Sequence, residues 1–528
     1  MDSGEARVRR RELLIAGAGA GLALAAPINY AAIARAGRRP LARTGRFASG
    51  VASGLPTPRA ITLWTKLEGI DQSSRLRLEV AEDRGFSKVV RETDVVASRR
   101  QGFTARARVG GLRPHEQYFY RFATAEKSSP VGRFRTAPPP DSRQRVRIGF
   151  FSCQDWNAGF YNAQLGLARE PDLDLVICLG DYMYETAFYG DDAVRRDRTG
   201  DNNDGDVQKL REYREKYALY RSDRNLRAMH AAHPFVAIWD DHEVEDNYAG
   251  DDPDEANGPR DQTKTGGGTG PRRVPFLQRR RNGYRAFFES MPRYRMKKDL
   301  SRIYGSVRLG RLCELFLLDQ RQYRDPQPCD DELFNPCPEY AEPRTMLGAA
   351  QKRWLKRNLA ESGATWKVLA NQLVMMSLDA VPGQHLNPDQ WDGYQVERQE
   401  ILEHVVANDV DNVVAVTGDI HTFFAGTVTT TGNSSGTPAA TEFVGGSATS
   451  LGIPEATGIP PATLATLAAS NQHVEYYEFE RRGYGVLELG RSGARCTLKA
   501  VDARARRSKP QVLKRFTVQP AVPGPQDA

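Results

Sequence analysis

The chain has 528 residues, of which 40% are hydrophobic and 27% charged, and its formal net charge is +8. This composition excludes a chain that is disordered throughout, and the length exceeds what one hydrophobic core ordinarily supports, so we expect two folded units. The positive charge comes from arginines spread along the chain, without a dense basic block interleaved with aromatic residues. We therefore find no specific nucleic-acid-binding motif, and the charge better suits solubility or attraction of anionic substrates.

The first 36 residues predict an export signal. Three arginines precede an Ala- and Gly-rich apolar stretch in "VRRRELLIAGAGAGLALAAP", which is too short and too glycine-rich for a good membrane span. Arg10 and Arg11, followed by Glu12 and two leucines, resemble the twin-arginine signal, with a Sec signal or an uncleaved amphipathic anchor as the alternative. Cleavage fits after residues 23–25 or 34–36. We expect a periplasmic or secreted protein, exported by the twin-arginine machinery and without a stable membrane span after signal removal.

Residues 45–137 predict a small all-β domain. Short runs such as "AITLWTKL", "LRLEVAED" and "QYFYRFAT" alternate apolar and polar residues and are separated by turn signals, as in an antiparallel sandwich. The stretch "GLRPHEQYFYRF" resembles the tyrosine corner of fibronectin type III domains, with Tyr118 or Tyr120 as the corner residue. The proline-rich "APPPDS" at 137–142 indicates a linker and a domain boundary.

Residues 145–515 predict a layered α/β domain. Continuous apolar runs suited to strands covered on both faces alternate with helical patterns, for example at 207–233, 349–363 and 394–409. Two polar insertions, 189–206 and 250–273, interrupt the pattern as flexible loops near the site or as decoration. We expect residues 516–528 to form a disordered tail. Cys329 and Cys337 lie close enough in a turn-rich loop to form a local disulfide.

Five apolar runs end in residues that bind metals. In a layered α/β sheet the strand ends converge on one edge, where ligands bind, so these side chains are expected to meet. Clustered carboxylates repel one another unless cations neutralise them, and metal ions are therefore the natural way to hold such a cluster folded. The residues that follow the runs are Cys153, Asp181 and Tyr184, Asp240 to Glu243 with Asn247, Asn371, and Asp419 with His421.

The chemistry of these donors suggests two kinds of ion. Thiolate, phenolate, imidazole and carboxylate together suit a transition metal, and phenolate in particular suits a ferric ion. Carboxylates with an amide oxygen suit calcium or another divalent cation that prefers oxygen. Asp181 stands between the two sets in the chain and is the expected bridge. Two metals about 4 Å apart would form a clamp for in-line displacement at phosphorus.

Separated segments of the chain resemble the PhoD-type alkaline phosphatases in order and spacing, over about residues 45–515. The resemblance implies a calcineurin-like metallophosphatase core behind a small β-sandwich. It also implies a hydrolase of phosphomonoesters, with a phosphodiesterase acting on nucleotides, nucleic acid or phospholipid head groups as the alternative. The segments are "FFSCQDWNAGFYNAQ", "DLDLVICLGDYMYE", "HPFVAIWDDHEVEDNYAG", "LLDQRQYRD", "QKRWLKRNLAESGATWKVLANQ", "LNPDQWDGYQVERQEIL", "VTGDIHTFFAG" and "TEFVGGSATS".

The same resemblance implies roles for individual residues. Fe³⁺ would be held by Cys153, Asp181, Tyr184 and His421. Ca²⁺ would share Asp181 and take Asp241, Asn371 and Asp419. His242 would lie beside the leaving oxygen as phosphate clamp or proton donor. Arg321 or Arg324 would grip the phosphate, with a salt bridge to Asp319 or Asp325 as the alternative.

The implied reaction is direct attack on phosphorus by a metal-activated water or hydroxide, releasing inorganic phosphate without a covalent phosphoenzyme. Two other classes of function were weighed against it. A surface-binding protein with a degenerate core would lack some of the ligand types, and all of them are present. A calcium-binding structural protein would show acidic loops at EF-hand or repeat spacing, and none appears.

Overall fold

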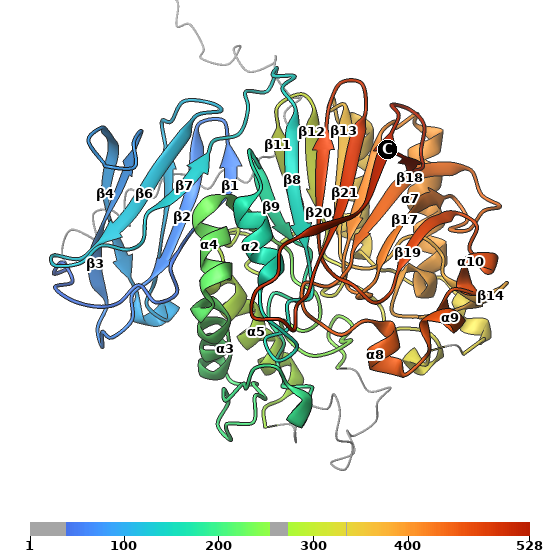
Figure 1. The fold of residues 1–528 in the computed structure, drawn as a ribbon, viewed down its shortest axis with the longest axis horizontal. Coiled ribbons are helices and arrows are strands. Elements are labelled where there is room, and N and C mark those ends of the chain that lie inside the picture. Colours follow the sequence, from blue (N-terminus) through green and yellow to red (C-terminus); the bar gives the residue numbers. More distant parts are fainter. Residues whose placement is uncertain (1–38, 254–272, 334) are drawn as a thin grey trace, which may run out of the picture.

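The computed structural model describes residues 39–253, 273–333 and 335–528. The predicted export signal at 1–36 and most of the insertion at 250–273 lie outside these residues. Two large β-sheets flanked by helices form the body of the protein, and a smaller β-structure lies at one side (Figure 1). Within the described ranges, no helix combines the length and the apolar character needed to cross a bilayer.

The N-terminal part is the predicted β-sandwich. Its alternating pattern buries every second residue of β6, and the buried side chains of two facing sheets form one core cluster that includes Leu63, Leu78 and Phe122. One sheet has the order β4-β3-β6-β7 and the facing one the order β1-β2-β5. The strands are β1 (Val51–Thr57), β2 (Ala60–Lys66), β3 (Ser74–Ala81), β4 (Val89–Ala97), β5 (Thr104–Gly110), β6 (Gln117–Ala123) and β7 (Gly132–Arg135).

Tyr118 is the corner residue of this sandwich. Its hydroxyl accepts a hydrogen bond from the backbone N–H of Arg113, five residues upstream, at 3.0 Å. The hydroxyl of Tyr120 is buried and has no such partner among the described residues. Of the two tyrosines that the sequence left open, the structure therefore selects Tyr118.

The sandwich and the core are joined by one continuous sheet. Strand β1 pairs in parallel with β10, with Ser53 opposite Pro234 and Gly54 opposite Phe235. An unpaired strand edge exposes backbone donors and acceptors, and this pairing satisfies those of β1. The two units expected from the sequence therefore share a ten-stranded sheet rather than being separate.

The ten-stranded sheet has the order β23-β22-β21-β20-β8-β9-β10-β1-β2-β5. Strands β8, β9, β10 and β1 are parallel to one another, and β20 is antiparallel to β8. Its strands outside the sandwich are β8 (Val146–Phe151), β9 (Leu175–Cys178), β10 (Pro234–Ala237), β20 (Arg482–Leu489), β21 (Ala494–Val501), β22 (Gln511–Val518) and β23 (Gln526–Asp527).

The second sheet has seven strands in the order β11-β12-β13-β16-β18-β17-β19, with β12, β13, β16 and β18 parallel. A separate small hairpin pairs β14 with β15. The strands are β11 (Gly305–Leu309), β12 (Cys313–Leu317), β13 (Trp366–Asn371), β14 (Asp379–Val381), β15 (Gln384–His385), β16 (Val413–Thr417), β17 (Phe423–Thr429), β18 (Pro438–Gly445) and β19 (Val474–Glu478).

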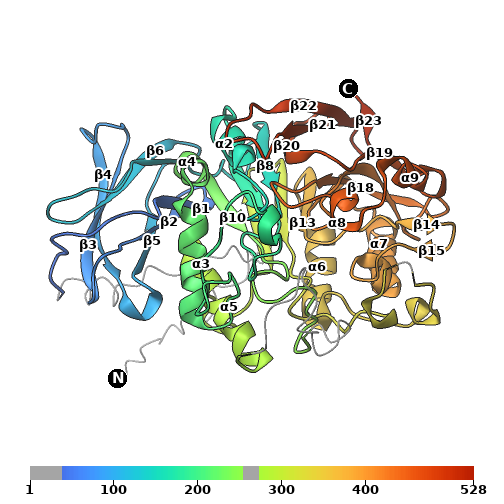
Figure 2. The same cartoon turned by 60° about the horizontal axis from the view of Figure 1, so that its bottom comes forward.

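The two sheets pack face to face between helices. One core cluster joins Val176 of β9 with Val416 of β16 and Phe287 of α5, and a second covers the other face of the seven-stranded sheet with Leu355 and Leu402. Figure 2 shows α6 and α7 on the far side of that sheet from β20–β22. The α-helices are α2 (Asn162–Arg169), α3 (Leu210–Ser222), α4 (Arg224–Ala232), α5 (Phe276–Ser290), α6 (Gly348–Glu361), α7 (Gln395–Ala407), α8 (Ile453–Thr457), α9 (Pro461–Leu464) and α10 (Leu467–Ser470). The 3-10 helices are η1 (Arg99–Gln101), η2 (Gly190–Asp192), η3 (Cys329–Asp331), η4 (Pro338–Ala341) and η5 (Trp391–Tyr394).

The helical pattern at 207–233 forms two helices instead of one. Asp223 adopts an extended conformation between α3 and α4, and its carboxylate accepts the backbone N–H groups of Asn225 and Leu226. This is the N-cap arrangement that aspartate favours, so the residue begins a new helix where the apolar periodicity alone suggested continuation.

The first polar insertion, at 189–206, is anchored to the core and is not a free loop. Lys216 of α3 is fully buried and pairs with Asp197 at 2.5 Å, while also donating to the carbonyl of Gly205. Arg195 stacks over Trp156 at 3.7 Å and pairs with Asp223 at 2.8 Å. Charged residues that looked solvated in the sequence therefore fasten this segment.

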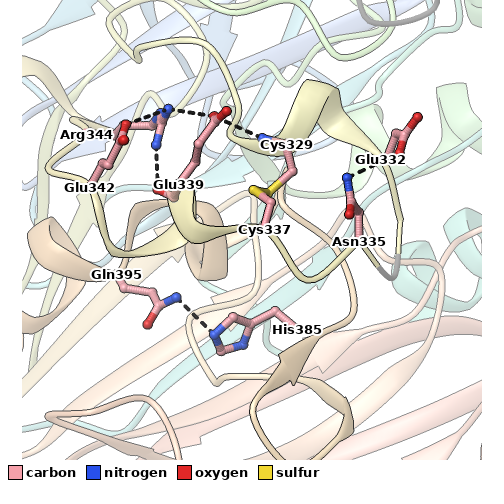
Figure 3. The surroundings of a disulfide bond; sticks show 9 residues. All are labelled: Cys329, Glu332, Asn335, Cys337, Glu339, Glu342, Arg344, His385 and Gln395. Carbon is pink, nitrogen blue, oxygen red and sulfur yellow. Dashed lines mark hydrogen bonds and ion pairs between the residues drawn. A yellow bond between two sulfur atoms is a disulfide. The ribbon is translucent and has the colours of Figure 1, made fainter.

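Two further expectations concern the C-terminus and the cysteines. The tail at 516–528 is not disordered: Phe516 to Val518 belong to β22, and β23 pairs with β22 through Phe516 and Asp527. Strand pairing satisfies the backbone of this polar segment, which its composition did not indicate. Cys329 and Cys337 form the disulfide expected from their spacing, with a Cα–Cα distance of 5.9 Å (Figure 3).

Candidate metal centre

The expected convergence of strand ends occurs, but across two sheets. Cys153, Asp181 and Asp241 follow β8, β9 and β10 of the ten-stranded sheet, whereas Asp419 and His421 follow β16 of the seven-stranded sheet. The two sheets approach closely here, because a Cβ on Gly418 would stand 2.6 Å from the Cβ of Ser152. The site therefore lies where the ends of both sheets meet.

The backbone is held in an unusual conformation at four of these positions. Cys153, Asp181, Asp419 and His421 have φ angles of 53°, 52°, 62° and 56°. Residues other than glycine rarely adopt this left-handed region, and such conformations concentrate at functional sites, where surrounding structure holds them. Gly180 before Asp181 has φ 118°, and a Cβ there would stand 2.5 Å from the Cβ of Asp240. Only glycine fits between these two strand ends.

The first group of donors contains a thiol, a carboxylate, an imidazole and a phenol. Ligand atoms of Cys153, Asp181 and His421 lie within 4.8 Å of one another. The Tyr184 hydroxyl lies 3.1 Å from Oδ2 of Asp181 and 3.1 Å from Nε2 of His421. The structure therefore brings together the four residues for which the sequence predicted a ferric site. Ser450 lies beside them and donates to the Tyr184 oxygen at 2.8 Å.

Two further groups of donors adjoin the first. Asp181, Asp241 and His242 form one, and Asp240, Asp241 and Asp419 form the other, each with ligand atoms within 4.8 Å. Asp181 belongs to two groups, as a bridging ligand would. Asp240 is fully buried and lies among these donors.

The side chain of Asn371 is held in hydrogen bonds at the end of β13. Its side-chain amide donates to the Leu373 carbonyl and, at 3.1 Å, to the Thr417 hydroxyl. Its oxygen accepts from Gln320 and, at 3.4 Å, from Trp391. Both the amide nitrogen and the oxygen of this side chain are thus engaged in hydrogen bonds within the protein. The role of Asn371 as a calcium ligand stays a prediction.

The two candidate arginines form salt bridges in this structure. Arg321 is fully buried and pairs with Asp240, with Asp389 at 2.8 Å and with Asp419 at 3.2 Å. Arg324 pairs with Asp389 at 2.7 Å and donates to the backbone carbonyls of Asn247 and Tyr248. The salt-bridge alternative therefore describes both, with different aspartates from the two that the sequence offered. The guanidinium of Arg321 thus neutralises part of the negative charge of the carboxylates at the centre.

His242 is fixed from several directions. Its Nδ1 lies 2.8 Å from Oε2 of Glu185, and its ring stacks on Tyr184 with centroids 4.0 Å apart. The ring of Phe188 meets it edge-on at 5.3 Å. Burial would lower the pKa of His242, but Asp241, Glu185 and Asp181 raise it well above the usual range. The residue is 8% exposed, so a protonated imidazole stands next to the donor groups within reach of a ligand.

His421 differs from His242 in that its pKa is lowered and not raised. Its Nδ1–H donates to the Leu451 carbonyl at 2.8 Å, which leaves Nε2 as the free acceptor facing Tyr184 and Asp181. Burial lowers the pKa of His421 to about 4, so the ring is neutral near neutral pH. A neutral imidazole with its other nitrogen held by a carbonyl is the form that ligates metals.

Three buried carboxylate oxygens in the centre have no hydrogen-bond partner in the described part of the chain. They are Oδ1 of Asp181, Oδ2 of Asp240 and Oδ1 of Asp241. Burial raises the pKa of Asp181 and of Asp240 well above the usual range, and raises that of Asp419 to about 7. A buried carboxylate destabilises the folded protein by several kcal/mol unless a cation compensates its charge. The donor set therefore fits metal ions, which would supply that compensation.

The acidic residues of "WDDHEVEDN" divide into donors and supports. Glu243 is buried and accepts the backbone N–H groups of Asp181, Tyr182 and Asp240 at 3.2, 2.7 and 2.8 Å. It therefore ties the end of β9 to the end of β10. Glu245 is also buried and pairs with Arg279 at 2.6 Å. Both therefore orient the loop.

Sequence reasoning missed two residues of the centre. Glu185 lies four positions after Asp181 in "GDYMYE", and its role becomes visible only when β10 brings His242 to it. Asp389 lies in "LNPDQWDGY", far from both arginines in the chain, and is buried against them. The only sequence signal was that both lie inside segments matching the family pattern.

Comparison with known proteins gives consistent results. The family model described as PhoD-like phosphatase matches residues 148–498, and the model for the N-terminal domain of PhoD-like phosphatases matches residues 32–138. Alkaline phosphatase D of Bacillus subtilis (strain 168) is 35% identical over 462 residues, which are 83% of this chain and 74% of that protein.

Solved structures agree with these matches. A structure of PhoD is similar with a TM-score of 0.81 at 30% identity, covering 92% of each chain. A purple acid phosphatase from yellow lupin (Lupinus luteus) seeds is similar with a TM-score of 0.55 at 13% identity, covering 91% of this chain and 75% of the other. The second likeness concerns the fold alone.

Proposed function

The chain belongs to the PhoD-like phosphatase family and is a phosphoric ester hydrolase of the alkaline phosphatase type, and we propose that its reaction depends on metal ions. The observation that carries this proposal is the pair of buried oxygens, Oδ1 of Asp181 and Oδ2 of Asp240, that accept no hydrogen bond from the described residues. Arg321 pairs with Asp240, Asp241 and Asp419. His242 lies beside Asp181 and Asp241, so two cationic side chains face four carboxylates. Cations at this position would remove the cost.

The donor types support two different ions. Cys153, Asp181, Tyr184 and His421 would hold a ferric ion, because thiolate and phenolate with imidazole suit a trivalent transition metal. Asp181, Asp241 and Asp419 supply oxygen only, and with Asp240 nearby they would hold calcium. The chemistry that bound ions would supply here is Lewis acidity, which would activate a water molecule as the nucleophile for direct attack on phosphorus.

The protein's own residues prepare the site for ester cleavage. His242, held by Glu185 and stacked on Tyr184, is positioned to donate a proton from Nε2 to the leaving oxygen. Asp240 and Asp419 are held in place by Arg321, and Oδ2 of Asp419 also accepts a hydrogen bond from Gln390 at 2.6 Å. Direct hydrolysis in this arrangement would release inorganic phosphate.

The iron assignment is tested by colour and metal content. The purified protein should contain iron and calcium and absorb visible light, because ferric ions bound to phenolate or thiolate are coloured. Tyr184→Phe should shift or bleach this band, while the matched control Tyr182→Phe should not, since the Tyr182 hydroxyl bonds to His230 outside the donor groups. A colourless, iron-free and fully active enzyme would overturn the assignment.

The ester preference is tested with two synthetic substrates. Hydrolysis of p-nitrophenyl phosphate should exceed that of bis-p-nitrophenyl phosphate if the enzyme acts mainly on monoesters. The reverse ratio would favour a phosphodiesterase. His242→Ala should lower kcat by about 10²–10⁴-fold, the usual contribution of a general acid, and an unchanged kcat would exclude that role.

We further propose that the chain is exported by the twin-arginine route to the periplasm or beyond the cell. The arginine pair at positions 10 and 11 supports this proposal, and so does the disulfide between Cys329 and Cys337, which persists in oxidising compartments. Replacing Arg10 and Arg11 by lysine should retain the protein in the cytoplasm, as measured by fractionation. Unchanged export would exclude the twin-arginine route.

A further inference from the structure

A cavity of about 340 Å³ lies next to the metal centre and includes none of its donors. Its walls come from the loop after β18, helix α8, the start of β20 and the turn between β21 and β22. Figure 1 shows α8 below the ends of the strands, on the side where this turn lies. Its lining is mostly polar and includes both acidic and basic side chains.

The cavity and the metal centre share one wall, residues 449–451. Thr449 and Leu451 line the cavity, and their backbones hold the metal donors on the other side. The Thr449 N–H donates to the Cys153 carbonyl at 3.2 Å, and the Leu451 carbonyl accepts the Nδ1–H of His421 at 2.8 Å. A molecule bound at the metal centre and a group bound in the cavity would therefore be separated by a single loop.

The charge of the lining is cationic. Arg482 is buried, pairs with Glu455 and donates to the carbonyl of Glu480. Arg481, Arg504 and Lys509 are exposed, and no salt bridge joins them to a carboxylate in the described ranges.

Of the carboxylates in the lining, Asp502 is committed to the turn, because its Oδ1 accepts the backbone N–H groups of Arg504 and Ala505. Glu455 is engaged by Arg482, and the third carboxylate, Glu480, is exposed. Four cationic side chains thus stand against three carboxylates, an excess of one positive charge.

The charged side chains that line the cavity indicate which class of ligand it could bind. An apolar group would have to displace water from charged side chains without replacing their hydrogen bonds, which is unfavourable. A metal ion is also unsuited, since the acidic residues of the lining form no group with metal-ligand spacing in the described chain. Arginine and lysine donors around a small-molecule-sized space suit an oxyanion such as phosphate or carboxylate.

We propose that this cavity binds a second anionic group of the substrate while the reacting phosphate occupies the metal centre. The inference rests on the proposed function and narrows its substrate class to esters that carry a further phosphate or carboxylate. The exposed side chains of Arg504 and Lys509 attract the second anionic group, and the buried Arg482 forms part of the cavity wall. The shared loop at 449–451 sets the separation between the two anionic groups.

Matched pairs of substrates test the proposal. Butanediol, hexanediol and octanediol bisphosphates are compared with the corresponding monophosphates by release of inorganic phosphate. For at least one chain length, kcat/KM for the bisphosphate should exceed that for the monophosphate well beyond the factor of two that two equivalent phosphates give. No preference at any length would overturn the proposal.

Reversing the charge of two lining residues tests whether the preference for bisphosphates arises in this cavity. In the double variant Arg504→Glu/Lys509→Glu the ratio of the two kcat/KM values should fall about tenfold, because attraction becomes repulsion. The control Arg491→Glu/Arg495→Glu has the same change in net charge on exposed positions at the opposite end of β21, and should keep the ratio. A ratio unchanged in the first variant, or equally lowered in the control, would refute the site.

Free phosphate is the other source of the same chemistry. If the cavity serves the product and not the substrate, inorganic phosphate will inhibit monophosphate hydrolysis non-competitively, and Arg504→Glu/Lys509→Glu will remove that inhibition; this result would overturn the substrate assignment. Failure of the proposed function is distinct, because then no variant would release phosphate from any of these esters.

Discussion

Replacing Asp181 by asparagine should make the metal-free protein more stable while inactivating the enzyme. The carboxylate is buried, and its Oδ1 has no partner among the described residues. Burial, with Asp241 and Asp240 nearby, raises its pKa well above the usual range. Because the folded pKa exceeds the unfolded one, the ionised carboxylate at neutral pH counts against the folded state. Asparagine has the same shape without that charge.

The size of the effect follows from the burial. A carboxylate that is ionised against a raised pKa destabilises the folded state by about 1.4 kcal/mol per pKa unit, so chelator-treated Asp181→Asn should resist urea by at least about this amount more than the treated wild type. With metals restored, hydrolysis of p-nitrophenyl phosphate should be more than about 100-fold slower than in the wild type. Even residues that only hydrogen-bond to metal ligands change activity by about 10–100-fold, and Asp181 is proposed to be a ligand itself.

A neighbouring carboxylate serves as the control of opposite sign. Glu245 is as buried as Asp181 but pairs with Arg279 at 2.6 Å, and both side chains are 1% exposed. Glu245→Gln should therefore lower the free energy of unfolding by about 3–5 kcal/mol, because it leaves a buried arginine uncompensated. The reasoning is refuted if Asp181→Asn destabilises the metal-free protein to a similar degree, or if it leaves the hydrolysis rate unchanged.

Three further outcomes are expected. Glu185→Gln removes one of the carboxylates that raise the pKa of His242, so the basic limb of the kcat–pH profile should move to lower pH, and an unshifted limb would argue against this acid. Lys216→Met leaves Asp197 buried without its partner, which should cost about 3–5 kcal/mol and speed proteolysis within 189–206; adding Asp197→Asn should recover part of the loss. Burial lowers the pKa of His233 to about 4, so the wild type should lose stability as pH falls from 6.5 towards 4, by at most about 1.4 kcal/mol per pH unit. The variant His233→Gln should show a flatter dependence of stability on pH, as measured by urea titrations at several pH values.

Much of the core could be predicted because it is encoded locally. Continuous apolar runs predict β8, β9, β13 and β16 because strands covered on both faces have no polar side, and period-two alternation predicts the sandwich. Helix α5 was not anticipated, since its arginines interrupt the apolar stripe in "FLQRRRNGYRAFFES". One of them, Arg279, is buried and paired with Glu245, which no local pattern reveals.

The sequence by itself determined which kinds of donor stand at the strand ends, because residue type and the preceding apolar run are both local properties. It did not determine which of them meet. Asp419 follows a strand of the second sheet, yet it meets Asp240 and Asp241, which follow a strand of the first. Glu185 and Asp389 acquired their partners only when distant segments folded together. Side-chain chemistry is carried by each residue, but distances at the centre depend on how two sheets pack and on backbone angles that surrounding contacts impose, and only the tertiary structure decides these.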